Sequence, residues 1–232
     1  MRYLGGKSRI AKQIVTAIER ERESNYIDCF VSLFCGSCSI ESKIKANKKI
    51  LNDKHEYLIA MWKAVQNGYK LPDVITDEQY KYIKSHKDED KALSGFVGFG
   101  CSFGGKWFGG LARNKKGDNY CARANQSIYK YLDGLKNAEF SCLDYKDVII
   151  PNGSVVYADP PYANTTGYST GAFNTDEFWN YMREISKNNM VFISEENAPD
   201  DFECIWQQDF KRMLDVNKAN IFMKTEKLWK YK

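Results

Sequence analysis

The residues best suited to chemistry are Asp159-Pro160-Pro161-Tyr162, which directly follow the apolar segment SVVYA. The two prolines remove two backbone donors and fix the backbone angle φ. The turn therefore presents the carboxylate of Asp159 and the carbonyl of Pro160 as two acceptors with no donor between them. Such a pair suits an exocyclic amino group, and the ring of Tyr162 could stack on the ring that bears it. We predict that these four residues are catalytic.

A second candidate site is the turn FCGS at residues 34–37, which ends the apolar run 26–34. A glycine turn after a strand lets a cofactor approach the backbone at the edge of an open α/β sheet. Asp53 ends the next apolar segment, KKILND, and an acidic side chain there can accept hydrogen bonds from ribose hydroxyls. The turn, the acidic residue and the DPPY segment together predict a cofactor site beside a catalytic turn.

The same turn contains Cys35 and Cys38 in C-x-x-C spacing, which is also the context of a thioredoxin-like redox site. In that alternative Cys35 would react, because a helix N-terminus favours the thiolate. A zinc site lacks ligands, since there is no second C-x-x-C and His55 and His86 have no suitable neighbours. The redox interpretation explains nothing else in the chain. We therefore favour the cofactor turn, expect no metal, and expect the seven cysteines to remain thiols.

The positive charge of the chain is concentrated in one segment. Residues 101–130 hold six lysines and arginines against Asp118 alone, a sum of +5, so the rest of the chain sums to −1 for a total of +4. Eight of the sixteen glycines lie within residues 95–117. This pattern predicts a flexible or tightly turning basic element.

The elements that must position these residues alternate between strands and helices, which indicates an α/β fold. Strands are predicted at 26–34, 48–53, 138–143, 154–158 and 190–194, with further strands at the C-terminus. Helices are predicted at 8–22, 39–47, 55–67, 77–85, 125–136 and 175–187. We expect a catalytic domain of residues 1–59 and 138–232, and an inserted, mainly helical region of residues 60–137.

Length and composition fit one large domain that carries this insert. The chain has 232 residues, of which 43% are hydrophobic. No stretch of ~18 apolar residues exists, which excludes a membrane-spanning helix, and the start has no apolar core of signal-peptide length. We therefore expect a cytoplasmic protein with no membrane partner.

Five short motifs resemble those of the Dam-type N6-adenine DNA methyltransferases, the alpha group with a DPPY motif. They are RYLGGK at 2–7, FCGSCS at 34–39, ND at 52–53, DY at 144–145 and DPPY at 159–162. Their order matches that of the family, in which a target-recognition region is inserted between the cofactor motifs and the catalytic motif. The resemblance therefore spans nearly the whole chain.

This resemblance implies a Rossmann-like methyltransferase that uses S-adenosyl-L-methionine and methylates adenine in double-stranded DNA. The cofactor-binding residues that it implies are Tyr3, Lys7, Phe34, Gly36, Ser37, Asp53, Asp144 and Asp159. One residue departs from the pattern: Cys38 stands where the family's F-x-G-x-G turn has its second glycine. We expect this change to alter the turn or lower its affinity for the cofactor.

Within this family the expected mechanism needs no metal. Asp159 and the Pro160 carbonyl would accept the two N–H bonds of an adenine that is flipped out of the duplex and stacked on Tyr162. The basic segment would contact DNA phosphates, and Trp107, Phe108 or Tyr120 would fill the gap that the flipped base leaves. The cations expected to contact DNA are Lys106, Arg113, Lys115, Lys116 and Arg123.

Two alternatives to a DNA enzyme stay open. A carboxylate and a carbonyl can hold any planar amine, so the chain could methylate RNA or another amino group. It could also be a nucleic-acid-binding protein whose cofactor site is impaired at Cys38. The motif order and the large insert favour duplex DNA. A place in a bacterial or phage restriction-modification system follows only from the resemblance, and the oligomeric state stays open between a monomer and a weak dimer.

Overall fold

A seven-stranded sheet forms the centre of the protein in the computed structural model, with strand order β3-β2-β1-β4-β5-β7-β6. The strands are β1 Cys29–Ser32, β2 Lys48–Asn52, β3 Ala138–Ser141, β4 Val155–Ala158, β5 Met190–Ser194, β6 Phe202–Met213 and β7 Ile221–Tyr231. The first five strands are parallel, whereas β7 runs antiparallel to both β5 and β6. The structure describes residues 1–22, 26–161, 173–213 and 221–232, with the backbone alone at 211–213 and 221–224. This topology confirms the predicted α/β, Rossmann-like fold.

Two hydrophobic cores cover the two faces of the sheet. Neighbouring residues of β1 belong to different cores: Phe30 lies in the first and Val31 in the second. The first core includes residues of α1 (Ala11–Arg20), α2 (Glu56–Gln66) and α5 (Tyr120–Leu132), and the second includes residues of α6 (Thr175–Ser186). A parallel sheet needs cover on both faces. Both faces of the parallel strands are therefore covered, and the carboxyl ends of these strands can hold a site.

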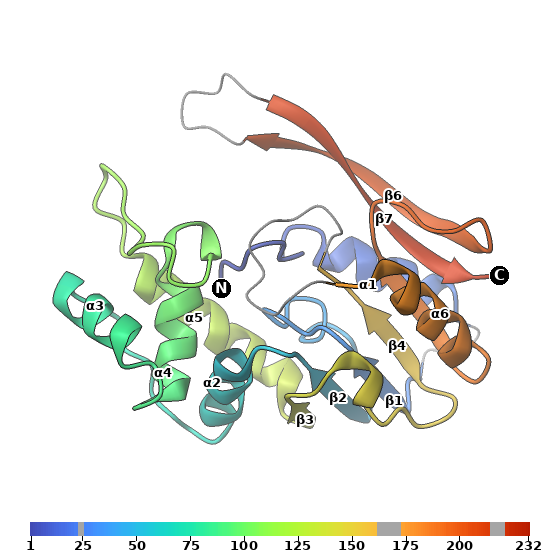
Figure 1. Ribbon diagram of the computed structural model, residues 1–232, viewed down its shortest axis with the longest axis horizontal. Helices are drawn as coiled ribbons and strands as arrows, with labels where there is room; N and C mark the ends of the chain where they lie inside the picture. Colours follow the sequence, from blue (N-terminus) through green and yellow to red (C-terminus); the bar gives the residue numbers. More distant parts are fainter. Residues whose placement is uncertain (23–25, 162–172, 214–220) are drawn as a thin grey trace.

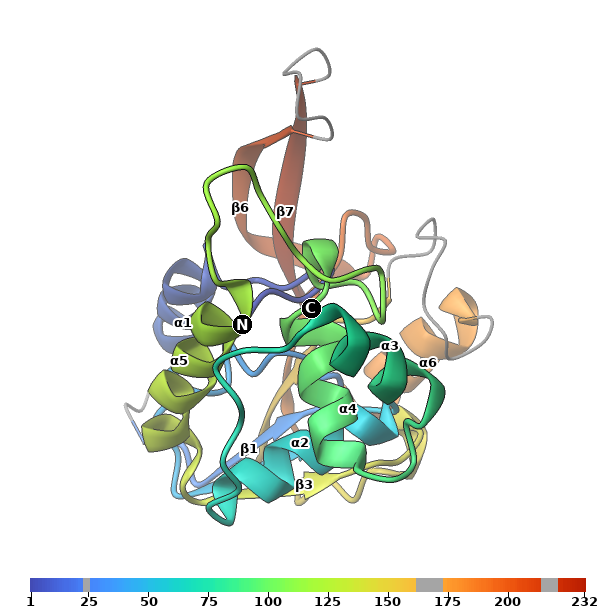
Figure 2. The same cartoon turned by 90° about the vertical axis from the view of Figure 1, so that its left-hand side faces the viewer.

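Four helices gather at the β3 end of the molecule (Figures 1 and 2). They are α2, α3 (Asp77–Ser85), α4 (Lys91–Gly95) and α5, and a π-helical turn at Phe96–Gly100 continues α4. Gly95 lets α4 approach α2, because a Cβ atom there would lie 2.1 Å from the carbonyl oxygen of Tyr57. Glycine in this part of the chain thus serves close helix packing at Gly95 and tight turns at Gly104, Gly105, Gly110 and Gly117, whose φ angles are positive, which agrees with the predicted tightly turning element. The division at residues 60 and 137 stays a prediction.

The helix predicted at 39–47 is wrong, because these residues form a series of turns. The apolar spacing that suggested a helix comes from Ile40 and Ile44, which are buried. The carbonyl of Glu41 accepts a hydrogen bond from Lys49 Nζ at 3.0 Å. Gly134 packs so closely on this segment that a Cβ atom there would lie 1.9 Å from the carbonyl oxygen of Ser42. Tertiary contacts therefore replace helical geometry here.

The other predicted elements are present, with shifted ends. The helix predicted at 77–85 has these bounds, whereas the one predicted at 125–136 begins earlier, at Tyr120. Asn119 sets this start, because its side chain accepts the backbone N–H of Ala122 at 2.9 Å and caps the helix. Within the described residues, no helix has the length and apolar character needed to cross a membrane.

Candidate active site

One cavity lies at the carboxyl ends of the parallel strands, where open α/β sheets bind ligands. Its walls include residues 33–37 after β1, 52–55 after β2 and 159–161 after β4, together with residues 3–7 near the N-terminus. All eight residues predicted to bind the cofactor line this cavity, as do Pro160 and Pro161. The predicted catalytic residue Tyr162 lies outside the described residues.

Asp53 holds the turn that the sequence predicted to bind the cofactor. One of its carboxylate oxygens accepts the backbone N–H of Gly36 at 2.9 Å, and the other accepts that of His55 at 2.9 Å. Burial raises the pKa of this carboxyl. The end of β2 is therefore fastened to the turn after β1, and both segments face the cavity.

Gly36 and Cys38 both adopt left-handed backbone conformations, with φ of +46° and +54°. At Gly36 a Cβ atom would lie 3.1 Å from the ring of Tyr3, so this position has little room for a side chain. Cys38 keeps the conformation that glycine adopts most easily. The departure from the family pattern therefore leaves a glycine-like turn, with the thiol buried in the core beside the cavity.

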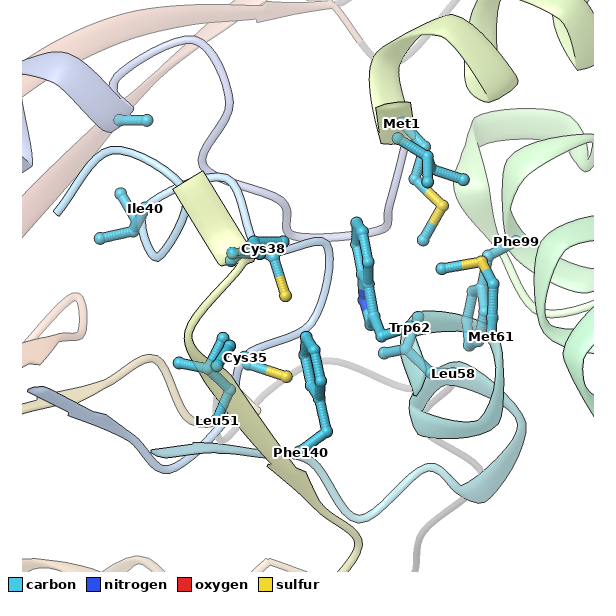
Figure 3. Close-up of a cluster of buried hydrophobic side chains, with 14 of the residues drawn as sticks. Met1, Cys35, Cys38, Ile40, Leu51, Leu58, Met61, Trp62, Phe99 and Phe140 are labelled. Atoms are coloured by element: carbon cyan, nitrogen blue, oxygen red, sulfur yellow. The ribbon is translucent and has the colours of Figure 1, made fainter. Parts of the chain in front are cut away.

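The thiols of this turn belong to the hydrophobic core. Figure 3 shows Cys35 and Cys38 among buried side chains such as Leu51 and Phe140. Burial raises the pKa of both thiols, that of Cys38 to about 11, so neither forms a thiolate readily. All seven cysteines are free. These observations do not support the redox alternative.

Lys7 connects the N-terminal segment to the catalytic turn. Its Nζ atom lies 2.9 Å from Asp159 Oδ1 and 3.5 Å from Glu226 Oε2, and only 3% of its side chain is exposed. Burial alone lowers the pKa of Lys7, but the two carboxylates outweigh burial and raise it above the usual value. Lys7 is therefore a buried ammonium ion between two carboxylates.

Aromatic rings form one end of the cavity. The ring of Phe34 lies 5.4 Å from that of Tyr145 and 6.2 Å from that of Phe173, measured between centroids. Beside them Asp144 forms an ion pair with Lys54 at 3.1 Å. Burial favours the neutral acid at Asp144, but hydrogen bonds from Lys54 and the Lys146 backbone, with the nearby lysine charges, lower its pKa overall. This end can hold a flat ring next to a negative charge.

A second aromatic group joins the cavity to the basic segment. The rings of Tyr3, His55 and Trp107 all lie about the ring of Phe99, with centroids 5.0 Å, 4.7 Å and 4.8 Å from it. Burial lowers the pKa of His55 to about 4, so its imidazole is neutral near pH 7. The backbone also connects the two parts, because the N–H of Leu4 donates to the carbonyl of Gly105 at 3.2 Å.

The five cations predicted to contact DNA are all exposed. Two of them have acidic partners: Arg113 forms an ion pair with Asp77, and Arg123 forms one with Asp118 at 2.6 Å. The structure thus places these five cations on the surface of the insert and not in the lining of the cavity. This position fits contact with a large anionic partner.

The three aromatic residues predicted to fill a gap in DNA differ in position. Phe108 is buried against Tyr80, which does not suit that role. Trp107 lines the cavity, and Tyr120 lies under the guanidinium of Arg2 at 4.6 Å. The exposed aromatic side chain nearby is Phe103, with 61% of its surface accessible, and the sequence analysis did not single it out.

Glu41, His55 and Glu226 also lie at the site, although none of them was predicted from the sequence. Glu41 lines the cavity and is buried, and burial raises its pKa to about 7. The position of His55, two residues after Asp53, was a signal for a place near the cavity. Neither Glu41 nor Glu226 lies next to a predicted site residue in a motif, because each reaches the site through a tertiary contact. Among the described residues, no group of three His, Cys, Asp or Glu residues could hold a metal ion.

The glycine turn closed by an acidic residue and the DPP turn line one cavity at the carboxyl ends of the strands, where α/β proteins with open sheets bind ligands such as nucleoside cofactors. The profile of the D12 class N6 adenine-specific DNA methyltransferases matches residues 3–97 and 109–219. The chain belongs to this family. Membership supports S-adenosyl-L-methionine as the cofactor, as the motif resemblance implied.

Individual relatives are distant. The type II methyltransferase M.FokI of Planomicrobium okeanokoites is 22% identical over 80% of this chain, which spans 32% of that protein's length. The type II methyltransferase M.MjaIII of Methanocaldococcus jannaschii is 24% identical, with 98% of this chain and 93% of that protein covered. The rRNA methyltransferase aviRa of Streptomyces viridochromogenes superposes with a TM-score of 0.47 at 9% identity, covering 99% of this chain and 86% of that one.

Proposed function

We propose that the protein is a site-specific DNA methyltransferase that transfers a methyl group from S-adenosyl-L-methionine to the N6 amino group of an adenine in duplex DNA. The observation that supports this most is that Asp159 and Pro160 share one cavity with Gly36 and Asp53. A cofactor held by the glycine turn would then lie next to an amine held by the DPP turn. Close positioning of two reactants is a large part of such catalysis.

The lining of the cavity suits the parts of this cofactor. The oxygens of Asp53 are acceptors for ribose hydroxyls, and the rings of Phe34, Tyr145 and Phe173 form a surface on which an adenine ring can stack. When bound, the cofactor supplies a methyl group on a positively charged sulfur. Lys7 carries one positive charge between the two carboxylates of Asp159 and Glu226, so this cluster has a net negative charge that favours a cation nearby.

Asp159 is the proposed acceptor for the reacting amine. Lys7 lies 2.9 Å from Asp159 Oδ1, and an ammonium at this distance favours the ionised carboxylate. An ionised Asp159 can accept one N–H of the target amine while the Pro160 carbonyl accepts the other. As the new N–C bond forms, the nitrogen becomes positive and its N–H bonds become stronger donors. Both hydrogen bonds therefore strengthen toward the transition state, and Asp159 can take the proton that the nitrogen releases.

An adenine inside a duplex cannot reach this turn, so the base must be flipped into the cavity. Tyr162 is the proposed stacking partner of the flipped base. The exposed cations Lys106, Lys115 and Lys116 are proposed to hold the flanking phosphates, as are Arg113 and Arg123 once they exchange their acidic partners for phosphate.

A methyl-transfer assay tests this function. The protein is incubated with S-adenosyl-L-methionine carrying a labelled methyl group and with duplex DNA, single-stranded DNA or RNA of mixed sequence, and the methylated base is identified after digestion. We expect N6-methyladenine in the duplex DNA. Label in RNA alone would replace the proposal by the RNA enzyme, and cofactor binding without transfer to any nucleic acid would contradict it.

A further inference from the structure

The last two strands extend beyond the sheet as a two-stranded arm. β7 pairs with β5 only at Leu228, Trp229 and Lys230, whereas β6 and β7 pair as far as Met213 and Ile221. Among the described residues, no third strand lies beside 207–213 and 221–227, and we call these residues the arm. Figures 1 and 2 show the arm projecting away from the sheet.

An isolated two-stranded ribbon has little stability of its own in water. The length of the arm therefore requires an explanation other than the stability of the sheet. The five strands that precede the arm, β1 to β5, have four or five residues each, against twelve for β6 and eleven for β7. A two-stranded β-ribbon is one of the two shapes that the major groove of duplex DNA admits. The shape of the arm thus fits the proposed substrate.

The charge of the arm fits the same partner. The described outer residues of the arm, 210–213 and 221–224, include three cations, Lys211, Arg212 and Lys224, and no acidic residue. The two acidic residues closer to the sheet have partners within the protein. Asp209 accepts a hydrogen bond from Thr225 Oγ1 at 2.6 Å, and Glu226 forms the ion pair with Lys7 at 3.5 Å. The outer part of the arm is therefore cationic.

The base of the arm adjoins the reaction centre. Glu226 contacts Lys7, which contacts Asp159 at 2.9 Å, so two ion pairs separate the arm from the catalytic carboxylate. Figure 1 shows the arm above the N-terminal segment and the insert loop 111–119 to its left, both projecting in the same general direction. A duplex whose adenine enters the cavity could therefore meet both the insert and the arm.

We infer that the arm is a second DNA-binding element, which contacts the duplex in addition to the basic segment of the insert. This inference rests on the proposed function. The arm adds at least three cations, Lys211, Arg212 and Lys224, to the contacts that hold the duplex. Each phosphate that a cation neutralises releases counterions, so these contacts increase the salt dependence of binding.

The test compares three variants. The first, Lys211→Ala/Arg212→Ala/Lys224→Ala, removes the charge of the arm. The second deletes residues 210–224 and joins Asp209 to Thr225, which pair across the two strands, through an Asn-Gly turn of the type that suits a two-residue hairpin. The control, Lys45→Ala/Lys136→Ala/Lys187→Ala, removes three exposed lysines that precede β2, β3 and β5, at the opposite edge of the sheet from the cavity.

Three quantities are measured for each variant: the dissociation constant for duplex DNA over a range of NaCl concentrations, the dissociation constant for S-adenosyl-L-methionine, and kcat and KM for methyl transfer. For both arm variants we expect weaker DNA binding and a lower slope of log K against log [salt]. At ~0.9 for each lost contact, the reduction is up to ~2.7 for the triple substitution and up to ~3.6 for the deletion, which also removes Lys218. Cofactor affinity should stay within about twofold, and the control should keep the slope of the unmodified protein.

The outcomes separate the arm from the proposed function. If the unmodified protein methylates duplex DNA and both arm variants keep its salt slope, the inference about the arm is wrong and the proposed function stands. If the unmodified protein shows no salt-dependent binding to duplex DNA, both are wrong. If shortening the arm abolishes a dimer in analytical ultracentrifugation and leaves the salt slope unchanged, the arm is a self-association surface instead.

Discussion

The cavity at the carboxyl ends of the parallel strands, here called the sheet edge, and the basic segment hold their polar groups in opposite ways. At the sheet edge, Asp53, Lys7 and Asp159 have partners at 2.9 Å, and Asp53 and Lys7 are buried. In the basic segment, Lys115 and Lys116 are exposed. A buried group depends on one fixed geometry with its partners, whereas an exposed cation is one of several side chains that contribute separately to the binding of an anionic partner. Single substitutions should therefore have large effects at the sheet edge and small, additive effects in the basic segment.

The largest effect is expected for Asp159→Asn. Asparagine keeps the shape of the side chain but replaces the carboxylate with a neutral amide, which is a weaker acceptor and cannot take a proton. We expect methyl transfer to duplex DNA to fall by about 10²–10³-fold, the range that the loss of one preorganised electrostatic contact produces. The control is Asp200→Asn, an exposed aspartate outside the cavity. If Asp159→Asn and Asp200→Asn were equally active, Asp159 would have no role in the reaction.

The second prediction concerns Glu41, a buried carboxyl that lines the cavity. Burial raises its pKa to about 7, and Ser32 Oγ donates to it at 2.8 Å. A carboxyl with a raised pKa in the folded state binds its proton more tightly there than in the unfolded chain. Its contribution to the free energy of unfolding is therefore unchanged below the unfolded pKa of 4.5, decreases as the pH rises to about 7, and is constant above that.

Glu41→Gln should remove this pH dependence, because the amide carbonyl can still accept from Ser32. Relative to the unmodified protein, we expect a gain on the order of 3 kcal/mol at pH 8 and none at pH 4, measured by urea unfolding at each pH. The matched control is Asp118→Asn in the basic segment. Asp118 is partly exposed and accepts from Asn114 and Arg123, which lower its pKa, so Asp118→Asn should show no gain in stability as the pH rises. A flat profile for Glu41→Gln would show that its carboxyl is not desolvated.

The third prediction compares two left-handed glycines, Gly36 at the sheet edge and Gly117 in the basic segment, with φ of +46° and +71°. Alanine is strained at both, by about 1–2 kcal/mol. At Gly36 the added Cβ atom also meets the Tyr3 ring at 3.1 Å, whereas nothing lies within 4 Å at Gly117. Gly36→Ala should weaken binding of S-adenosyl-L-methionine about tenfold in calorimetry, which corresponds to about 1.4 kcal/mol. Gly117→Ala should leave that affinity unchanged. If the two variants bound S-adenosyl-L-methionine equally well, the turn at Gly36 would not be tight.

The same contrast explains what the sequence could predict. The motifs at residues 2–7, 34–39, 52–53 and 159–162 converge because the carboxyl ends of parallel strands meet at one edge, so strand order was enough to bring them together. The helix at 39–47 was wrong because the backbone of Glu41 is held by Lys49, a tertiary contact that no local pattern shows. Glu226 reaches Lys7 only through the register of the long β6–β7 hairpin.

The basic segment was predictable in charge but not in shape. Its composition identified the exposed cations correctly, because a lysine such as Lys115 needs no special packing to be exposed. Composition could not separate the exposed Phe103 from the buried Phe108, which lie five residues apart in the same glycine-rich stretch. That difference depends on Gly98, where the rings of Trp107 and Phe108 pack so closely that a Cβ atom would lie 2.2 Å and 2.9 Å from them.

The smallest effect is expected for single cations of the basic segment. Lys115→Ala should reduce the slope of log K against log [salt] for duplex DNA by ~0.9 and leave kcat and the affinity for S-adenosyl-L-methionine unchanged. Lys115→Ala/Lys116→Ala should double that reduction, because two exposed side chains with separate phosphate contacts act additively. Lys45→Ala, at the opposite edge of the sheet, is the control. A loss of kcat in Lys115→Ala with no change in slope would mean that this segment acts on the reaction centre, as the buried groups do, and would remove the contrast between the two regions.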